Sequence, residues 1–252
     1  LLNRLLQMIS GVFAPVCYVL AAGGLLQGLL IILTMAVPSV TETGVYQVFN
    51  FISWTPFTFL PVLLAISASK HFHCNPYIAA ACCLALVNPV WTEMAGKIAE
   101  GENIRFLFVN LTEITYTSSV LPPLILVALL SKLEKFLNKH LPELIKSLFT
   151  PLICLAALVP LTIVVIGPLI QWLSNGVAAG YNLLYQMAPP IAGAVVGGVW
   201  QVIVIFGIHW GMVPIVIANF AQNGQDTLQI FIQIAVISQM AAAFGVFLKA
   251  KD

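Results

Sequence analysis

Long apolar runs constrain the fold of this chain more than any other feature. Several reach about 20 residues with few or no charges, which is the length that a helix needs to cross the hydrocarbon core of a bilayer. A membrane barrel would instead show alternating segments of about ten residues. Charged residues make up 8% of the chain, whereas soluble domains contain roughly a quarter. The sequence therefore predicts an all-α integral membrane protein that forms a multi-span helical bundle.

Prolines and glycines inside the apolar runs predict that some of these helices are broken or re-entrant. Pro56 and Pro61 predict a bend in the second span, and Asn88-Pro89 predicts an interruption in the third. The polar segment 97–118 separates the third span from the fourth and contains the β-prone run FLFVNLTEITYT. The expected spans lie at about 11–37, 45–69, 75–95, 119–131, 150–173, 190–208 and 228–248.

Two segments have the pattern of amphipathic helices at the membrane surface. Residues 1–9 place polar side chains on one helical face and leucines on the other, which predicts a short interfacial helix. Residues 131–147 carry a stripe of lysines at spacings of 3, 4 and 7, which predicts a basic amphipathic helix. We expect this stripe to contact lipid headgroups, and docking of a soluble partner is the alternative. The four lysines are Lys132, Lys135, Lys139 and Lys146.

The distribution of basic residues orients the chain by the positive-inside rule. Arg4, Lys70 and the lysines of 131–147 fall on the cytoplasmic side, while Glu42 and the segment 97–118 fall on the other. The lysines near the C-terminus do not fit the same count of crossings. Either a segment crosses only part-way or these lysines are not cytoplasmic. We favour a broken or re-entrant segment at 209–226, where glycines and a proline are frequent, over 177–188.

Several function classes find no support in the sequence. The net charge of +1 gives no reason to expect a nucleic-acid partner. The five cysteines lack metal-ligand spacing, and His71 and His73 would point about 200° apart on a helix, so we expect no metal and no cofactor. The chain has no Walker A motif or other phosphate-binding loop. Any phosphoryl chemistry would therefore need a donor that is held elsewhere.

The stretch FGIHWGMVPIVIANFAQNGQD at 206–226 is the strongest candidate for a solute site. It gathers neutral hydrogen-bonding groups beside an aromatic ring, at the end of an apolar run. Sugar hydroxyls both donate and accept hydrogen bonds, and an indole can stack on a pyranose, so this composition suits an uncharged polyhydroxylated ligand. A lone histidine at a membrane interface can equally be satisfied by water or a carbonyl. The candidate residues are His209, Trp210, Gln201, Asn219 and Asn223.

Two other classes of function are alternatives to sugar binding. An ion- or proton-coupled secondary transporter of a small neutral solute usually holds a charged residue in mid-span, and the expected spans contain none at their centres. A membrane enzyme acting on a lipid or polyprenyl substrate, with His209 as base, would need an acidic metal-binding motif, and the sequence has none. Sugar binding fits better than either.

Three stretches in this order resemble a known family: FLPVLLAISASKHFHCNPYIAAA (59–81), YTSSVLPPLILVALLSKLEKFLNKHLPELIKSLFTPLICL (116–155) and the stretch 206–226. The chain is similar, over essentially its whole length, to the membrane C domain (EIIC) of bacterial phosphoenolpyruvate-dependent sugar phosphotransferase permeases. Within the glucose superfamily, it is most similar to the β-glucoside type.

The resemblance implies a homodimer in the inner membrane that binds a β-glucoside-type sugar and carries it across the lipid bilayer. A phosphocysteine on the B domain of the same permease then phosphorylates the sugar. The family's G-x-H motif maps onto Gly207-Ile208-His209, which implies that His209 contacts the sugar, either as a general base or only as a hydrogen-bond partner. Trp210, Gln201, Asn219 and Asn223 are weaker candidates for sugar contacts.

The family's second signature, a glutamate in a G-I-T-E-P hairpin, does not occur in this sequence. We therefore expect residues 1–252 to form a single membrane transport domain that corresponds to the N-terminal part of an EIIC domain, with the C-terminal portion absent. We also find no residue in this chain that matches the phosphoryl-carrying motifs of the A and B domains.

Overall fold

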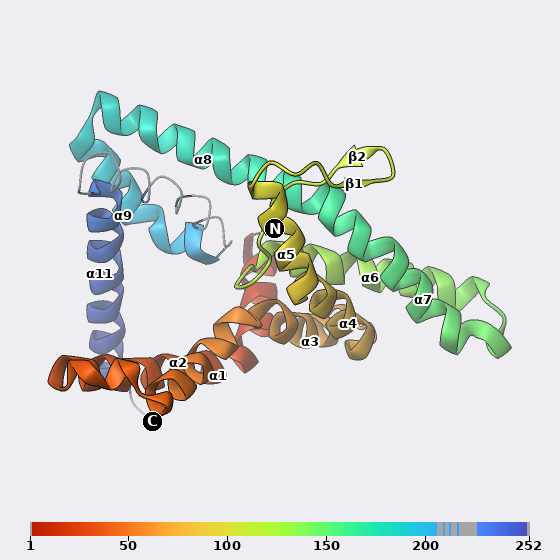
Figure 1. Ribbon diagram of the computed structural model, residues 1–252, viewed down its shortest axis with the longest axis horizontal. Helices are drawn as coiled ribbons and strands as arrows, with labels where there is room; N and C mark the ends of the chain where they lie inside the picture. The colour runs from red at the N-terminus through yellow and green to blue at the C-terminus, as the bar shows by residue number, and fades with distance from the viewer. Residues whose placement is uncertain (1, 206–208, 210–211, 213–215, 217–225, 251–252) are drawn as a thin grey trace. The chain divides into compact units, whose positions relative to one another are not determined.

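The computed structural model describes residues 2–205, 209, 212, 216 and 226–250, and side chains from residue 11 onward (Figure 1). Its chain divides into two compact units, Leu1–Pro168 and Leu169–Asp252. Almost all of the described residues are helical, which confirms the all-α fold class. The strands among the described residues form one two-stranded hairpin, and loops and turns join the elements.

The first unit contains most of the helices and the hairpin. Its two short antiparallel strands, β1 (Arg105–Phe106) and β2 (Val109–Asn110), lie within the β-prone run. The helices before them are α1 (Leu2–Ala36), α2 (Gly44–Thr58), α3 (Leu60–Phe72), α4 (Pro76–Leu86) and α5 (Pro89–Ala99), with a 3-10 turn η1 (Pro38–Glu42) after α1. After them come α6 (Leu121–His140), α7 (Glu143–Leu161) and a π turn η2 (Thr162–Ile166).

Asparagine-proline pairs start two of these helices. The Asn75 side chain accepts hydrogen bonds from the backbone N–H groups of Tyr77 and Ile78 at 2.9 and 3.3 Å, and Asn88 accepts one from Val90 at 2.9 Å. In each case proline fills the first helical position, where its missing N–H is not needed. The interruption predicted at Asn88-Pro89 is therefore confirmed, and it separates α4 from α5.

The bend predicted in the second span is also confirmed. Helices α2 and α3 meet at Phe59, and their axes bend by 40° there. Pro61 lies in the first turn of α3, where it cannot donate to the last carbonyls of α2. Together the two helices are apolar and long enough to form one broken span.

The two predicted amphipathic segments have other boundaries in the structure. Residues 2–9 do not form a separate short helix, because α1 runs without a break from Leu2 to Ala36. Residues 131–147 are not one helix but belong to the second half of α6 and the first turn of α7. The break lies at Leu141-Pro142, because proline restricts the preceding residue to extended backbone. Their location at the membrane surface stays a prediction.

Four described helical stretches are long and apolar enough to cross a membrane: Gly11–Ala36, Pro76–Ala99, Glu143–Met187 and Thr227–Lys249. The α2–α3 pair adds a fifth. The alternative segment for a part-way crossing was 177–188, and all of it except Ala188 belongs to the helical stretch Glu143–Met187. Helix α6 is charged in its second half, and α9 (Pro189–Ile205) is short, so neither meets the same criteria. The chain is a multi-span helical membrane protein.

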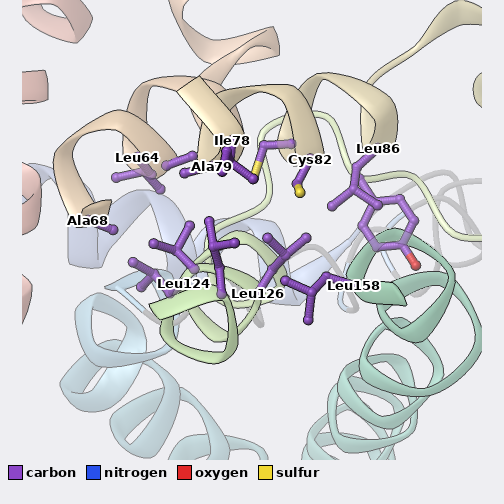
Figure 2. Packing of buried hydrophobic residues seen from close by; sticks show 14 of the residues in the cluster. Leu64, Ala68, Ile78, Ala79, Cys82, Leu86, Leu124, Leu126 and Leu158 are labelled. Atoms are coloured by element: carbon purple, nitrogen blue, oxygen red, sulfur yellow. The ribbon is translucent and has the colours of Figure 1, made fainter. Parts of the chain in front are cut away.

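The core of the first unit lies where α3 and α4 pack against α6 and α7. Figure 2 shows side chains of α3 and α4 pointing toward side chains of α6 and α7. Buried hydroxyl and indole groups add hydrogen bonds to backbone carbonyls of distant segments. Ser67 donates to the carbonyl of Val12 at 2.6 Å and Ser131 to that of Phe72 at 2.6 Å. Each bond holds two segments more than fifty residues apart in one register.

A buried tyrosine holds the segment after the hairpin against the π turn. The Tyr116 hydroxyl donates to the carbonyl of Thr162 at 3.3 Å, and burial raises the pKa of Tyr116 well above its ordinary value. A Cβ atom on Gly167 would lie 2.1 Å from this hydroxyl oxygen, so only glycine leaves room for it. Trp91 of α5 donates to the carbonyl of Ile114 at 2.9 Å and fixes the same segment from its other side.

Candidate functional site

The second unit contains the described candidate residues, on and after α9. Its helices are α8 (Gly167–Met187), which begins at the end of the first unit, α9 (Pro189–Ile205) and α11 (Thr227–Lys249). They share a small core of their own. Its buried members are Ala178, Tyr181, Ala192, Val196, Trp200, Met212, Leu228 and Ala235.

Helices α9 and α11 approach closely because Gly193 has no side chain. A Cβ atom there would lie 2.7 Å from the nearest ring carbon of Phe231. About two turns further along α9, the amide of Gln201 donates to the backbone carbonyl of Ala235 in α11 at 3.3 Å. Gln201, predicted as a sugar contact, therefore also links the two helices that border the candidate site.

His209 lies beside Trp200, a residue that sequence reasoning did not select. Their ring centroids are 6.2 Å apart and the ring planes make an angle of 71°, an edge-to-face arrangement. Trp200 is buried with 5% of its surface exposed, and Nδ1 of His209 is buried as well. The packing of α9 against α11 therefore fixes the tryptophan that the histidine ring contacts. The sequence feature that could have identified Trp200 is its position directly before Gln201, inside an apolar run.

The last residue of the stretch 206–226, Asp226, lies at the start of α11. Asp226 is 4% exposed, and its carboxylate caps α11 by accepting a hydrogen bond from the backbone N–H of Gln229. The Tyr181 hydroxyl of α8 is buried close to Asp226 and Thr227. Tyr181 and Tyr185, one helical turn apart, stack at 5.8 Å between centroids. A tyrosine pair at this spacing on an apolar helix is the only sequence signal for them.

Three of the predicted residues, Trp210, Asn219 and Asn223, lie outside the described residues, as does most of the expected re-entrant segment 209–226. Of the five candidates, the structure therefore describes Gln201 and His209. Both are in the second unit, next to the aromatic core of α9 and α11. Within the described part of the chain, no group of three or more histidine, cysteine, aspartate or glutamate residues is placed to hold a metal ion.

The chain matches a known protein family over almost its whole length. The family model described as "Phosphotransferase system, EIIC" matches residues 10–251. The chain belongs to this family. With its spanning-length helices, it is a multi-pass EIIC protein of the inner membrane, as its sequence predicted.

Curated relatives of this EIIC chain carry several sugar specificities in their names. The β-glucoside-specific EIIBCA component of Dickeya chrysanthemi is 39% identical over all of this chain and 40% of its own length. The sucrose-specific EIIBC component of Bacillus subtilis (strain 168) is 29% identical, over 98% of this chain and 54% of its own length. The arbutin-, cellobiose- and salicin-specific EIIBC component of Escherichia coli (strain K12) is 27% identical, over 88% and 46%. No solved structure matches the chain.

The chain thus spans about two fifths of the length of its β-glucoside relatives. Those relatives are named as fused EIIBCA proteins, in which the C domain is one of three parts.

Proposed function

We propose that this chain is the sugar-translocating part of a phosphotransferase permease that binds a β-glucoside-type sugar. The observation that carries the proposal is the EIIC match over 10–251, together with β-glucoside-specific relatives that are 33–39% identical over the whole chain. The second unit contains groups that suit a neutral sugar: a histidine ring beside the buried indole of Trp200, and the primary amide of Gln201, which follows Trp200 in α9. An ion-coupled transporter is not favoured by this family membership.

His209 acts as the principal sugar ligand, and Trp200 is its positioning residue. The edge-to-face contact restricts the rotation of the imidazole, so that a ring nitrogen can accept from, or donate to, a sugar hydroxyl in a fixed direction. Trp210, Asn219 and Asn223 follow in the same stretch and contribute further hydroxyl contacts or stacking. Gln201 supports the site through its bond to Ala235 and contributes its carbonyl oxygen as an acceptor.

Phosphorylation takes place on the cytoplasmic side, and its donor is the phosphocysteine of the B domain. The sugar hydroxyl oxygen attacks phosphorus, the sulfur–phosphorus bond breaks, and the cysteine leaves as a thiolate. The hydroxyl proton passes to a base, and we assign this role to His209. The working permease is a homodimer, and light scattering of the purified protein in detergent measures this state directly.

Equilibrium binding of radiolabelled cellobiose or arbutin to the purified chain tests the proposal. We expect saturable binding by the wild type and a Kd at least about tenfold higher for His209→Ala, because a lost hydrogen bond of about 1.4 kcal/mol changes affinity tenfold. His140→Ala is the matched control, since this exposed histidine of α6 lies in the first unit.

Three further outcomes are informative. Trp200→Phe keeps an aromatic ring but changes the edge that faces His209, so it should weaken binding less than His209→Ala does. Equal affinity of the His209→Ala and wild-type proteins would contradict the assigned ligand. Uptake by vesicles that follows the membrane potential and does not need a phosphorylated B domain would contradict the permease function itself.

A further inference from the structure

The turn between β1 and β2 exposes four apolar residues in a row. Phe106, Leu107, Phe108 and Val109 are all exposed, Leu107 by 77% and Phe108 by 98%. A phenylalanine that is almost completely exposed contacts nearly nothing in its own chain. Figure 1 shows the hairpin as an extension of the segment that leaves α5. A contiguous exposed apolar tip of this kind indicates a contact with another apolar phase.

The backbone holds this tip in a defined shape. Arg105 pairs with Asn110 across the strands, and its Nε donates to the Asn110 side-chain oxygen at 2.9 Å. The Leu111 N–H donates to the Ile104 carbonyl at 2.9 Å and closes the base of the hairpin. Leu107 has a φ of 55°, a left-handed conformation that glycine or asparagine adopts more easily. A leucine at this position gives the turn an apolar side chain, although leucine adopts the left-handed conformation less readily than glycine.

The hairpin begins close to one surface of the bilayer. It follows the spanning-length stretch Pro76–Ala99, in which the break at Asn88-Pro89 separates α4 from α5. The 24 residues of this stretch are enough to cross a hydrocarbon core of about 30 Å. The returning segment is fixed by the buried residues Ile114 and Tyr116. The hairpin is therefore held near the membrane at both ends. By the positive-inside rule, this surface faces away from the cytoplasm.

Charges and apolar groups are separated along the hairpin. Glu100, Glu102 and Arg105 lie at its base, and the four apolar residues form its tip. A segment with this division can place its charged base among lipid headgroups and its apolar tip below them. The aromatic and aliphatic side chains of the tip then lose contact with water without leaving a charge in hydrocarbon.

A second copy of the chain is a poorer occupant of the tip. A stable protein interface buries about 800 Å² on each partner, with roughly 20–30 residues a side. Four residues on a narrow turn provide far less surface than that. A lipid boundary needs no complementary surface, so a small tip is sufficient for it.

We propose that the Phe106–Val109 turn is a membrane anchor that inserts into the lipid interface on the non-cytoplasmic side. The anchor fixes the end of α5 and the segment after the hairpin relative to the bilayer. It does not depend on which solute the chain carries.

Photo-crosslinking from the tip tests the anchor. Benzoylphenylalanine replaces Phe108 in the full chain, and membrane vesicles that contain it are irradiated and analysed by mass spectrometry. We expect phospholipid adducts through the acyl chains, at least several-fold more than from benzoylphenylalanine at Glu102, an exposed residue at the base of the same hairpin. Size-exclusion chromatography confirms that each variant is folded.

Two outcomes would overturn the proposal. Adducts between two copies of the chain would assign the tip to a protein interface. Lipid adducts no more frequent than those from Glu102 would place the tip in water. The same probe at Leu107, the other strongly exposed tip residue, gives an independent measurement if the Phe108 variant does not fold.

Discussion

The contacts inside the first unit of this EIIC chain differ in kind from the contacts inside the second. In the first unit, side chains such as Ser67, Ser131 and Trp91 donate to backbone carbonyls of distant segments. The same unit also has a continuous apolar core. In the second, α9 and α11 share a smaller core, one close contact at Gly193 and one amide bond from Gln201. The first arrangement fixes the register of many segments. The second fixes mainly one helix pair.

This difference suggests a structural role for the first unit and a binding role for the second. Bonds to backbone carbonyls are independent of the identity of the accepting residue, so they secure a register without requiring particular neighbours. In the second unit one such bond comes from a candidate residue, because Gln201 donates to the backbone carbonyl of Ala235. The other described candidate, His209, contacts the Trp200 side chain. We therefore expect substitutions in the first unit to act mainly on stability and those in the second to act also on sugar binding.

Gly167→Ala should have the largest effect on stability. The new Cβ would lie 2.1 Å from the Tyr116 hydroxyl, and Tyr116 is fully buried and cannot move away. Overpacking costs about 1–3 kcal/mol, occasionally more, and we expect the upper part of that range. The midpoint of thermal unfolding in detergent measures it. Tyr116→Phe in the same background removes the hydroxyl and should restore part of the loss. An unchanged midpoint for Gly167→Ala alone would show that the tyrosine is not held as described.

Gly193→Ala should cost less than Gly167→Ala. The added Cβ meets the edge of the half-buried Phe231 ring, which can shift, and alanine gains about 1 kcal/mol over glycine in a helix. The same thermal measurement checks it. In a Phe231→Leu background the sign should reverse, so that alanine stabilises. If alanine still destabilises there, the close approach of α9 and α11 has another cause.

Asp226→Ala should destabilise by about 0.5–2 kcal/mol, the usual cost of losing a helix cap. The carboxylate accepts from the Gln229 N–H at the start of α11. Asp226→Asn retains an acceptor oxygen and is the matched control, with a loss of a few tenths at most. Chemical unfolding followed by circular dichroism separates the two. Equal losses for both variants would indicate that the charge, and not the cap, matters at this position.

The smallest expected effect is the labelling of Cys74 by maleimide, which should be slow at neutral pH. Burial, followed by the nearby Glu134 carboxylate, raises the pKa of Cys74 to about 11 from 9.0, so that its thiol stays protonated at neutral pH. The reactive thiolate is then roughly 100-fold scarcer at pH 7 than for an unperturbed thiol. Mass spectrometry of maleimide-treated protein should show labelling that increases as the pH approaches 11. Glu134→Gln should increase the rate, and rapid labelling of the wild type at pH 7 would contradict the raised pKa of Cys74.

Local sequence signals predicted much of the first unit. Asn88-Pro89 ended one helix and started another because proline and a capping amide act within a few residues. The bend near Pro61 followed from the same physics. Pro142, by contrast, divided the lysine-rich segment into two helices, although the periodicity of the lysines continues across it. Side-chain periodicity alone does not report a break in the backbone.

The candidate site was less accessible to sequence reasoning. His209 and Gln201 were selected because polar groups are conspicuous in an apolar run. Trp200 and Tyr181 are aromatic residues among many, and their roles depend on how α8, α9 and α11 pack. Tertiary contacts of this kind leave no local pattern. The selection of Trp210, Asn219 and Asn223 stays a prediction.

The π turn at Thr162–Ile166 has a consequence for reading this sequence as a helical wheel. A π turn holds one more residue than an α turn, and one residue corresponds to about 100° of rotation in an α-helix. A wheel drawn continuously from α7 into α8 would assign every side chain after Gly167 to the wrong azimuth. Deletion of a single residue between 162 and 166 would restore a regular α count, and a continuous wheel would then assign the side chains of α7 and α8 correctly.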